Sequence, residues 1–220
     1  MAGATIFVAT LPRRVPMKLY YMPGACSLSP HIALREAGLD FQLVRVGRDK
    51  RTADGRDFRE INPFGYVPAL ELPTGEVLLE GPAIVQYIAD LKPESGLAPA
   101  NGTLDRYRLQ SVRGLIKSEI HKSIGALFNP ALDDAGQAAA REKIDLRLGQ
   151  LEGTLRDDAW LVGEHFGVAD AYLYVVTSWL AHFDIDIGRW PKLAAHNARV
   201  ANRPAVQAAR RAEKDPGRTA

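Results

Sequence analysis

The chain has 220 residues, of which 46% are hydrophobic and 25% are charged, and its formal net charge is +2. This composition is ordinary for a globular protein, and so small a net charge gives no field that would select nucleic acid. One cysteine excludes an intramolecular disulfide and a multi-cysteine zinc site, and the five histidines show no metal-binding spacing. We therefore expect no metal, no nucleic-acid partner and a reducing, cytoplasmic compartment.

Residues 1–16 precede the periodic part of the sequence, which begins at Met17. Their apolar stretch resembles the core of a signal peptide, but Arg13 and Arg14 follow that stretch instead of preceding it. We therefore expect a flexible extension, or a start codon assigned too early. The longest apolar run elsewhere lies within residues 171–181, about half the roughly 20 residues that a membrane span needs, so no membrane partner is expected.

Residues 17–92 combine short strand patterns with two helix patterns. An aromatic-rich run ends at Pro23-Gly24, and Pro30 suits the first turn of a helix that Gly38 ends. The predicted strands cover 18–22, 41–46, 67–72 and 77–79, and the predicted helices cover 29–38 and 80–91. The order β-α-β followed by β-β-α predicts a mixed sheet with helices packed on it.

The rest of the chain reads as helix after a linker at 93–103. The stretch 92–103 holds two prolines, two glycines and few large apolar residues, as linkers do. Apolar residues at helical spacing predict helices over 104–128, 137–158, 168–183 and 193–202, with a further helical stretch after Pro204. We therefore expect an all-helical domain at 104–213 and a frayed tail at 214–220.

Five sequence blocks, in this order, carry a resemblance to a known family. They are "MKLYYMPGACSLSPHIALREAGLDF" (17–41), "INPFGYVPAL" (61–70), "LLEGPAIVQYIADLKP" (78–93), "SEIHK" (118–122) and "VADAYLY" (168–174). The chain resembles the cytosolic glutathione transferases, and most closely their bacterial beta class. This resemblance implies an α/β thioredoxin-like N-terminal domain followed by an all-α domain, glutathione as co-substrate and a homodimer.

Cys26 is the first candidate for chemistry. It lies in a turn that enters a helix, where unpaired N–H groups and the helix dipole lower the pKa of a thiol. Ser29 stands where a C-x-x-C motif would have its second cysteine, so a disulfide cannot be resolved within the chain. The alternative is a buried, inert thiol. The resemblance implies that Cys26 lies at the glutathione sulfur and can form a mixed disulfide with it.

Three further candidates lie near the strands. Tyr21 is either an activator of the glutathione thiol, as in other transferase classes, or an aromatic packed in the core. The resemblance implies a cis bond between Val67 and Pro68, with the backbone of Val67 pairing with the cysteinyl part of glutathione.

Charged and small residues supply the other predicted contacts to glutathione. Glu80 can accept from the γ-glutamyl ammonium, and the N–H groups that begin at Gly81 can bind the neighbouring carboxylate. The alternative is an acidic residue that merely stabilises a helix N-terminus. Lys50 is preferred over Arg51 for the glycine carboxylate, although a solvated loop charge is the default for both.

Ser118 and His121 share a polar stripe on the helix predicted over 104–128. The stripe is either a solvated face or the wall of a cleft. The resemblance places His121 near the glutathione thiol, where an imidazole with a pKa near 6.5 can exchange a proton, and counts Ser118 among the glutathione contacts. Gly114 and Gly167 depart from the family, which often has an asparagine and a Ser/Thr N-cap at these places.

Three functions fit these residues. The main hypothesis is an enzyme in which glutathione thiolate attacks a small hydrophobic electrophile, with Cys26, His121 and Tyr21 as catalytic residues. The first alternative is a thiol-disulfide reductase or peroxidase in which Cys26 itself is the nucleophile. The second alternative is a non-catalytic binding protein with the same fold.

Overall fold

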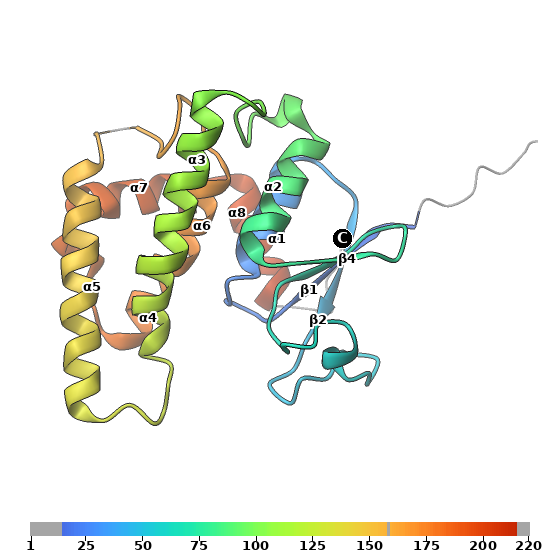
Figure 1. The fold of residues 1–220 in the computed structure, drawn as a ribbon, viewed down its shortest axis with the longest axis horizontal. Helices are drawn as coiled ribbons and strands as arrows, with labels where there is room; N and C mark the ends of the chain where they lie inside the picture. The colour runs from blue at the N-terminus through green and yellow to red at the C-terminus, as the bar shows by residue number, and fades with distance from the viewer. Residues whose placement is uncertain (1–14, 158, 215–220) are drawn as a thin grey trace, which may run out of the picture.

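The computed structural model describes residues 15–157 and 159–214. The extension expected at 1–16 and the tail expected at 214–220 lie outside this range, apart from residues 15, 16 and 214. Figure 1 shows a sheet carrying two helices on one side of the molecule and a helical bundle on the other.

The N-terminal part contains a four-stranded mixed sheet. Its strands are β1 (Met17–Tyr21), β2 (Phe41–Arg45), β3 (Ala69–Glu71) and β4 (Val77–Leu79), in the spatial order β2-β1-β3-β4. β1 and β2 run parallel, whereas β3 is antiparallel to both β1 and β4. Helices α1 (Leu28–Glu36) and α2 (Gly81–Leu91) follow β1 and β4 in the chain. The predicted mixed sheet is confirmed, and β3 begins only after Pro68, which has no N–H to donate to a ladder.

The C-terminal part is entirely helical, as predicted. Its helices are α3 (Leu104–Leu115), α4 (Lys122–Ala126), α5 (Asp134–Thr154), α6 (Val168–Thr177), α7 (Pro191–Ala201) and α8 (Pro204–Lys214). The continuous helix expected over 104–128 is interrupted by a π-helical segment at Ile116–His121. The helix expected over 168–183 ends at Thr177 and continues as a 3-10 helix at Ser178–Phe183.

A shared apolar core joins the two parts. Buried side chains from both form one cluster, and α1 packs against α2 as well as against α6 and α8 of the helical part. All ten residues of α6 are buried, as its nearly uniform apolar sequence predicts for a central helix. Side chains at the interface between the sheet and the bundle are therefore packed against residues of both parts.

The close approach of the linker explains why a glycine occupies position 167. Its N–H donates to Asp170 Oδ2 at 2.9 Å, and the next residue, Val168, donates its N–H to the carbonyl of Leu97 at 3.0 Å. A Cβ at position 167 would lie 2.9 Å from that carbonyl oxygen. The serine or threonine expected from the family would therefore collide with the linker backbone.

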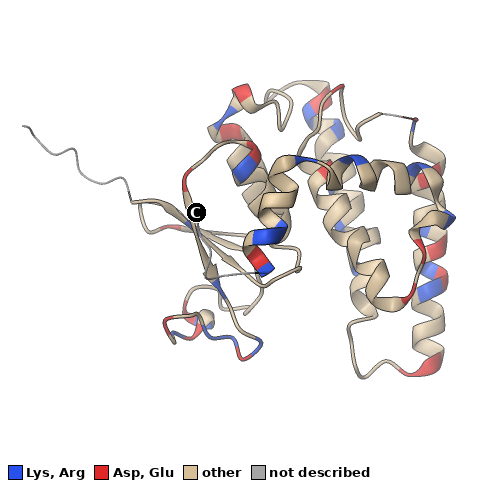
Figure 2. Ribbon diagram, turned by 180° about the vertical axis from the view of Figure 1, so that it is seen from behind, with Lys and Arg blue, Asp and Glu red and all other residues tan. Residues whose placement is uncertain are grey.

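Basic and acidic residues are interspersed along the described part of the chain. Figure 2 shows basic and acidic segments interspersed along the helices and around the loop that follows β2. None of the helices in the described ranges is long and apolar enough to cross a bilayer. Within the same ranges, no group of three or more His, Cys, Asp or Glu side chains is arranged to hold a metal ion.

Candidate active site

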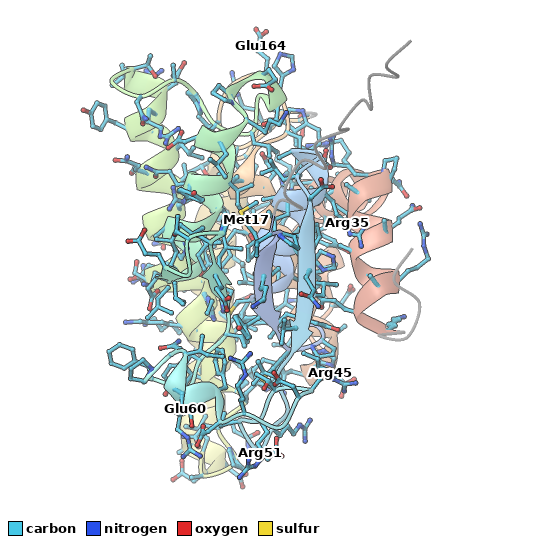
Figure 3. All side chains as sticks on the ribbon, turned by 90° about the vertical axis from the view of Figure 1, so that its right-hand side faces the viewer. Met17, Arg35, Arg45, Arg51, Glu60 and Glu164 are labelled. Atoms are coloured by element: carbon cyan, nitrogen blue, oxygen red, sulfur yellow. The ribbon has the colours of Figure 1, made fainter. Side chains whose placement is uncertain are left out.

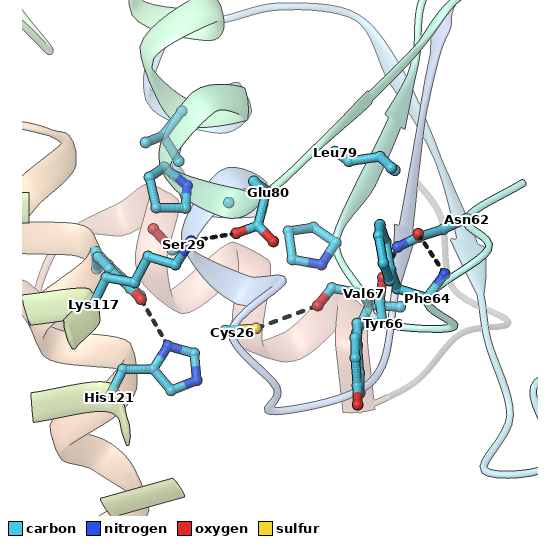
Figure 4. A pocket seen from close by; sticks show the side chains of 15 residues that line it. Cys26, Ser29, Asn62, Phe64, Tyr66, Val67, Leu79, Glu80, Lys117 and His121 are labelled. Atoms are coloured by element: carbon cyan, nitrogen blue, oxygen red, sulfur yellow. Dashed lines mark hydrogen bonds and ion pairs between the residues drawn. The ribbon is translucent and has the colours of Figure 1, made fainter. Parts of the chain in front are cut away.

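A cavity of about 400 Å³ opens between the sheet and the helical bundle. The N-terminal part lines it with Cys26, with the loop that carries Val67, and with the start of α2 at Glu80. The helical part faces these residues with Lys117 and His121 of the π-helical segment, as Figure 4 shows. The chain thus brings together residues that are far apart in the sequence, such as Cys26, His121 and Tyr172.

The Cys26 thiol faces the loop before β3. Cys26 follows a turn in which the Ala25 N–H donates to the Met22 carbonyl, and its Sγ donates to the carbonyl of Val67 at 3.4 Å. The Val67-Pro68 peptide bond is cis, as the resemblance implied. Cys26, Val67 and Pro68 therefore line one wall of the cavity together.

Burial controls the acidity of this thiol. Removal from water, together with a smaller effect of the Glu80 charge, raises the pKa of Cys26 from 9.0 to about 11, although the N–H groups of Cys26 and Ser27 act in the opposite direction. The expectation that the helix entry would lower this pKa is therefore wrong. At neutral pH Cys26 carries its proton and is a hydrogen-bond donor.

Alkylation should report this protonation directly. We expect iodoacetamide to modify Cys26 in the folded protein about 100-fold more slowly at pH 8 than in the urea-unfolded chain, because a pKa two units higher leaves about 100-fold less thiolate. The rate in the folded protein should keep rising up to pH 10. Since Cys26 is the sole cysteine, mass spectrometry follows it without ambiguity. A folded-state rate that levels off near pH 8 would contradict the raised pKa.

His121 faces the thiol from the helical part. Its Nδ1 lies 2.6 Å from the hydroxyl of Tyr172, and its ring packs edge-on against Trp179 with centroids 4.9 Å apart. Burial lowers the pKa of His121, and the nearby charge of Lys117 lowers it further. Burial also raises the pKa of Tyr172, which stays protonated. A neutral imidazole whose Nδ1 accepts from Tyr172 carries its own proton on Nε2.

Glu80 and Gly81 lie where β4 passes into α2, and both line the cavity. Glu80 adopts a left-handed backbone conformation with φ of 68°, and its Oε2 forms an ion pair with Lys117 Nζ at 2.7 Å. The sequence analysis did not identify Lys117. It lies four residues before His121, a spacing that places two residues on one helix face and was available as a signal.

The structure does not bring every predicted residue into the cavity. Tyr21 is 1% exposed, packs beside the ring of His31 and does not line the cavity, so its predicted catalytic role is withdrawn in favour of a core aromatic. Ser118 is exposed and also does not line it. The π-helical segment explains this: its hydrogen bonds run from i to i+5, so residues four or five apart share a face, and Lys117 takes the place expected for Ser118.

Lys50 borders the cavity instead of lining it. Its Nζ donates to the carbonyl of Gly65 at 2.9 Å and lies 5.7 Å from the ring centroid of Tyr66, which does line the cavity. Arg51 donates to the carbonyl of Gly55 and lies at the outer end of its loop in Figure 3. This arrangement favours Lys50 over Arg51, as the sequence analysis did.

The turn before Cys26 is held by the helical part at Gly24. The Gly24 N–H donates to Glu213 Oε2 at 2.9 Å, and its carbonyl accepts from Trp179 Nε1 at 2.8 Å. Glu213 is 3% exposed and also contacts Nδ1 of buried His31 at 3.0 Å. Neither Glu213 nor Trp179 was predicted, because their partners are more than 150 residues away in the sequence.

Fold and site together define a class of protein. A thioredoxin-like sheet, a cysteine at a helix entry beside a cis-proline loop, and a cavity closed by a helical domain are the features of a protein that binds a thiol-bearing peptide.

Comparison with known proteins supplies the family. Residues 15–90 match "Glutathione S-transferase, N-terminal domain" and residues 115–204 match "Glutathione S-transferase, C-terminal domain". The glutathione S-transferase GstA of Escherichia coli O157:H7 is 40% identical over 198 residues, which cover 90% of this chain and 98% of GstA. The chain therefore belongs to the glutathione S-transferase family, a family of transferases.

Two solved structures refine the assignment. A sphingomonad glutathione S-transferase complexed with glutathione is 50% identical, with a TM-score of 0.86 over 90% of this chain and 98% of that one. A bacterial beta-class glutathione S-transferase from Sphingomonas chungbukensis is 48% identical, with a TM-score of 0.86 over 89% and 98% of the two chains. The predicted family, its bacterial beta class and the two-domain fold are confirmed.

Proposed function

We propose that this protein conjugates glutathione to small apolar electrophiles. The observation that carries the proposal is the cavity itself, which sets the protonated thiol of Cys26 and the Val67 carbonyl opposite the neutral imidazole of His121. Glutathione would lie with its cysteinyl backbone along Val67, its γ-glutamyl end at Glu80 and Gly81, and its glycine end toward Lys50. The complex of the sphingomonad relative with glutathione supports this ligand.

The residues at the cavity would act on the glutathione sulfur. A thiol with a pKa near 8.5 is only a few per cent thiolate at neutral pH, and each unit of depression favours thiolate by about 1.4 kcal/mol. Cys26 Sγ–H and His121 Nε2–H are two neutral donors that can stabilise the thiolate without becoming charged. The glutathione thiol releases its proton to solvent, the thiolate attacks the electrophilic carbon, a C–S bond forms, and the leaving group departs with its electron pair.

The electrophile would bind among apolar side chains. Phe64, Tyr66 and Leu79 supply apolar side chains to the lining of the cavity. Apolar walls with few polar groups fit a small hydrophobic molecule. No metal is required for this reaction, and the protein would work where glutathione is kept reduced, which fits the cytoplasm.

Replacing Cys26 with alanine separates conjugation from disulfide chemistry. We expect conjugation of a halonitroarene to fall by about tenfold or less, because His121 remains as a donor. Any reduction of a glutathione mixed disulfide should disappear. Loss of both activities together would instead make Cys26 the nucleophile. A wild-type protein that neither binds immobilised glutathione nor turns over a halonitroarene would be a non-catalytic binding protein.

We also propose a homodimer, based on apolar side chains that this chain leaves exposed. Phe64 and Tyr66 are 76% and 71% exposed, and Leu104 and Tyr107 on α3 are 64% and 59% exposed. Side chains of this size are commonly covered by a partner. We expect sedimentation velocity to give a dimer for the wild type and for Leu146→Glu, an equally drastic change on α5, and a monomer for Phe64→Glu. A monomeric wild type would refute the dimer.

A further inference from the structure

An ion pair crosses the cavity at the end where α2 begins. Lys117 on the π-helical segment reaches from the helical part to Glu80, and both residues line the cavity. Figure 4 shows the pair spanning the gap between the two parts. Their side chains are 47% and 66% exposed, so solvent and ligands can reach both charges. Exposed pairs of this kind are weakly held and exchange partners readily.

The N-terminus of α2 offers few donors to an anion. The N–H groups of Ala83 and Ile84 donate to the carbonyl of Glu80 at 2.9 and 3.0 Å. Pro82 has no N–H. Gly81 is therefore left as the residue of the first turn that can donate an N–H to a ligand. A carboxylate at a helix N-terminus is normally held by several N–H groups. A carboxylate bound at the start of α2 therefore needs a further donor from elsewhere in the protein.

We propose that Lys117 supplies the missing donor and binds the α-carboxylate of the γ-glutamyl residue of glutathione. This inference rests on the proposed function. The γ-glutamyl end is a zwitterion, so its ammonium would take Glu80 while its carboxylate takes Lys117 and the Gly81 N–H. Glu80 and Lys117 would separate from each other, and each would pair with the ligand group of opposite charge. No charge is then left without a counter-ion. Of the described residues that line the cavity, Lys117 is the one lysine or arginine.

Arg113 fixes the distance between the two halves of this subsite. It is 6% exposed on α3, donates Nη1 to Gln86 Oε1 at 2.7 Å and donates Nη2 to the carbonyl of Pro82. The first turn of α2 is thereby tied to the helix that leads into the segment carrying Lys117. The subsite therefore depends on both domains, and its geometry is set before the ligand arrives.

Binding of two peptides to Lys117→Met tests the proposal. The peptides are glutathione and 4-aminobutyryl-cysteinylglycine, which lacks only the α-carboxylate, and Kd is measured by calorimetry. Wild type should bind the second peptide about tenfold more weakly than glutathione. Lys117→Met should bind glutathione about tenfold more weakly than wild type does, and it should lose most of the preference for glutathione over the second peptide, with only the Gly81 N–H left to hold the carboxylate. Binding is measured instead of turnover because Lys117 also lowers the pKa of His121.

Lys143→Met is the matched control, because it removes the same charge from an exposed position on α5. It should leave both Kd values unchanged. An unchanged Kd for glutathione in Lys117→Met would overturn the inference, and so would an equal loss for the two peptides. A wild-type protein that binds neither peptide would refute the proposed function itself.

Pro82→Ala independently tests whether Lys117 stands in for the N–H group that Pro82 lacks. This variant restores the N–H that proline lacks, so the first turn of α2 gains a second donor for the carboxylate. In the Pro82→Ala background, Lys117→Met should weaken glutathione binding by about threefold or less. The same tenfold loss in both backgrounds would show that Lys117 does not stand in for the absent N–H.

Discussion

Replacing Asp170 with alanine is expected to lower the free energy of unfolding by about 3–5 kcal/mol. Asp170 is 1% exposed, and its carboxylate accepts from the N–H groups of Leu161 at 3.0 Å and Gly167 at 2.9 Å, as well as from His196 Nε2 at 2.8 Å. The substitution leaves buried His196 and the partly buried N–H groups of Leu161 and Gly167 without an acceptor, and each buried unsatisfied group costs about 1–3 kcal/mol. Urea denaturation followed by circular dichroism measures the change.

Two further variants sharpen this prediction. Asp170→Asn keeps the shape but turns one carboxylate oxygen into a donor that faces a donor, so we expect an intermediate loss of about 2 kcal/mol. Asp157→Ala removes an exposed carboxylate and should change stability by no more than about 0.5 kcal/mol. An Asp170→Ala protein as stable as Asp157→Ala would show that the network around Asp170 adds nothing.

His121→Ala is expected to reduce kcat/KM for conjugation by about 100-fold. The reason is that His121 is the donor that faces the proposed sulfur position from the helical part, held by Tyr172 and Trp179. His165→Ala, at an exposed position, is the matched control and should retain wild-type kinetics. A His121→Ala enzyme within threefold of wild type would remove His121 from the reaction.

The pH dependence of activity gives the same residue a second test. Because burial and Lys117 lower the pKa of His121, the imidazole stays neutral until the pH falls below its ordinary value of 6.5. Protonating Nδ1 would remove the acceptor through which Tyr172 holds the imidazole, so activity should fall as His121 becomes charged, and the acid limb of kcat/KM should lie below pH 6.5. Removing the charge of Lys117 raises the pKa of His121, so Lys117→Met should move that limb to higher pH. If the acid limb of kcat/KM for Lys117→Met lies at the same pH as for the wild type, that limb reports the titration of a group other than His121.

Local sequence patterns were sufficient for the elements and for part of the site. The apolar periodicity of 168–183 predicted a central helix, and all ten residues of α6 are buried. Cys26, Val67, Pro68, Glu80, Gly81 and His121 were predicted and all line one cavity. The resemblance to a known family supplied Val67, Pro68 and His121, whereas Cys26, Glu80 and Gly81 could also be proposed from their places at the starts of predicted helices.

Helical spacing failed where the helix itself departs from the α form. Ser118 was placed on the same face as His121 by counting α-helical turns, but the π-helical segment changes that count and exposes Ser118. Lys117 takes its place. Tyr21 was placed at the site by analogy with other transferase classes, although strand alternation leaves open which face a side chain occupies until the sheet is packed.

The sequence by itself determined the order of strands and helices and the family, because these depend on local periodicity and on short motifs. The tertiary structure decided which charges meet and how acidic each group is. Cys26 shows the difference: its place at a helix entry predicts a lowered pKa, whereas burial in the folded protein raises it to about 11. Desolvation depends on everything packed around a group, and that environment comes from residues as distant as Glu80.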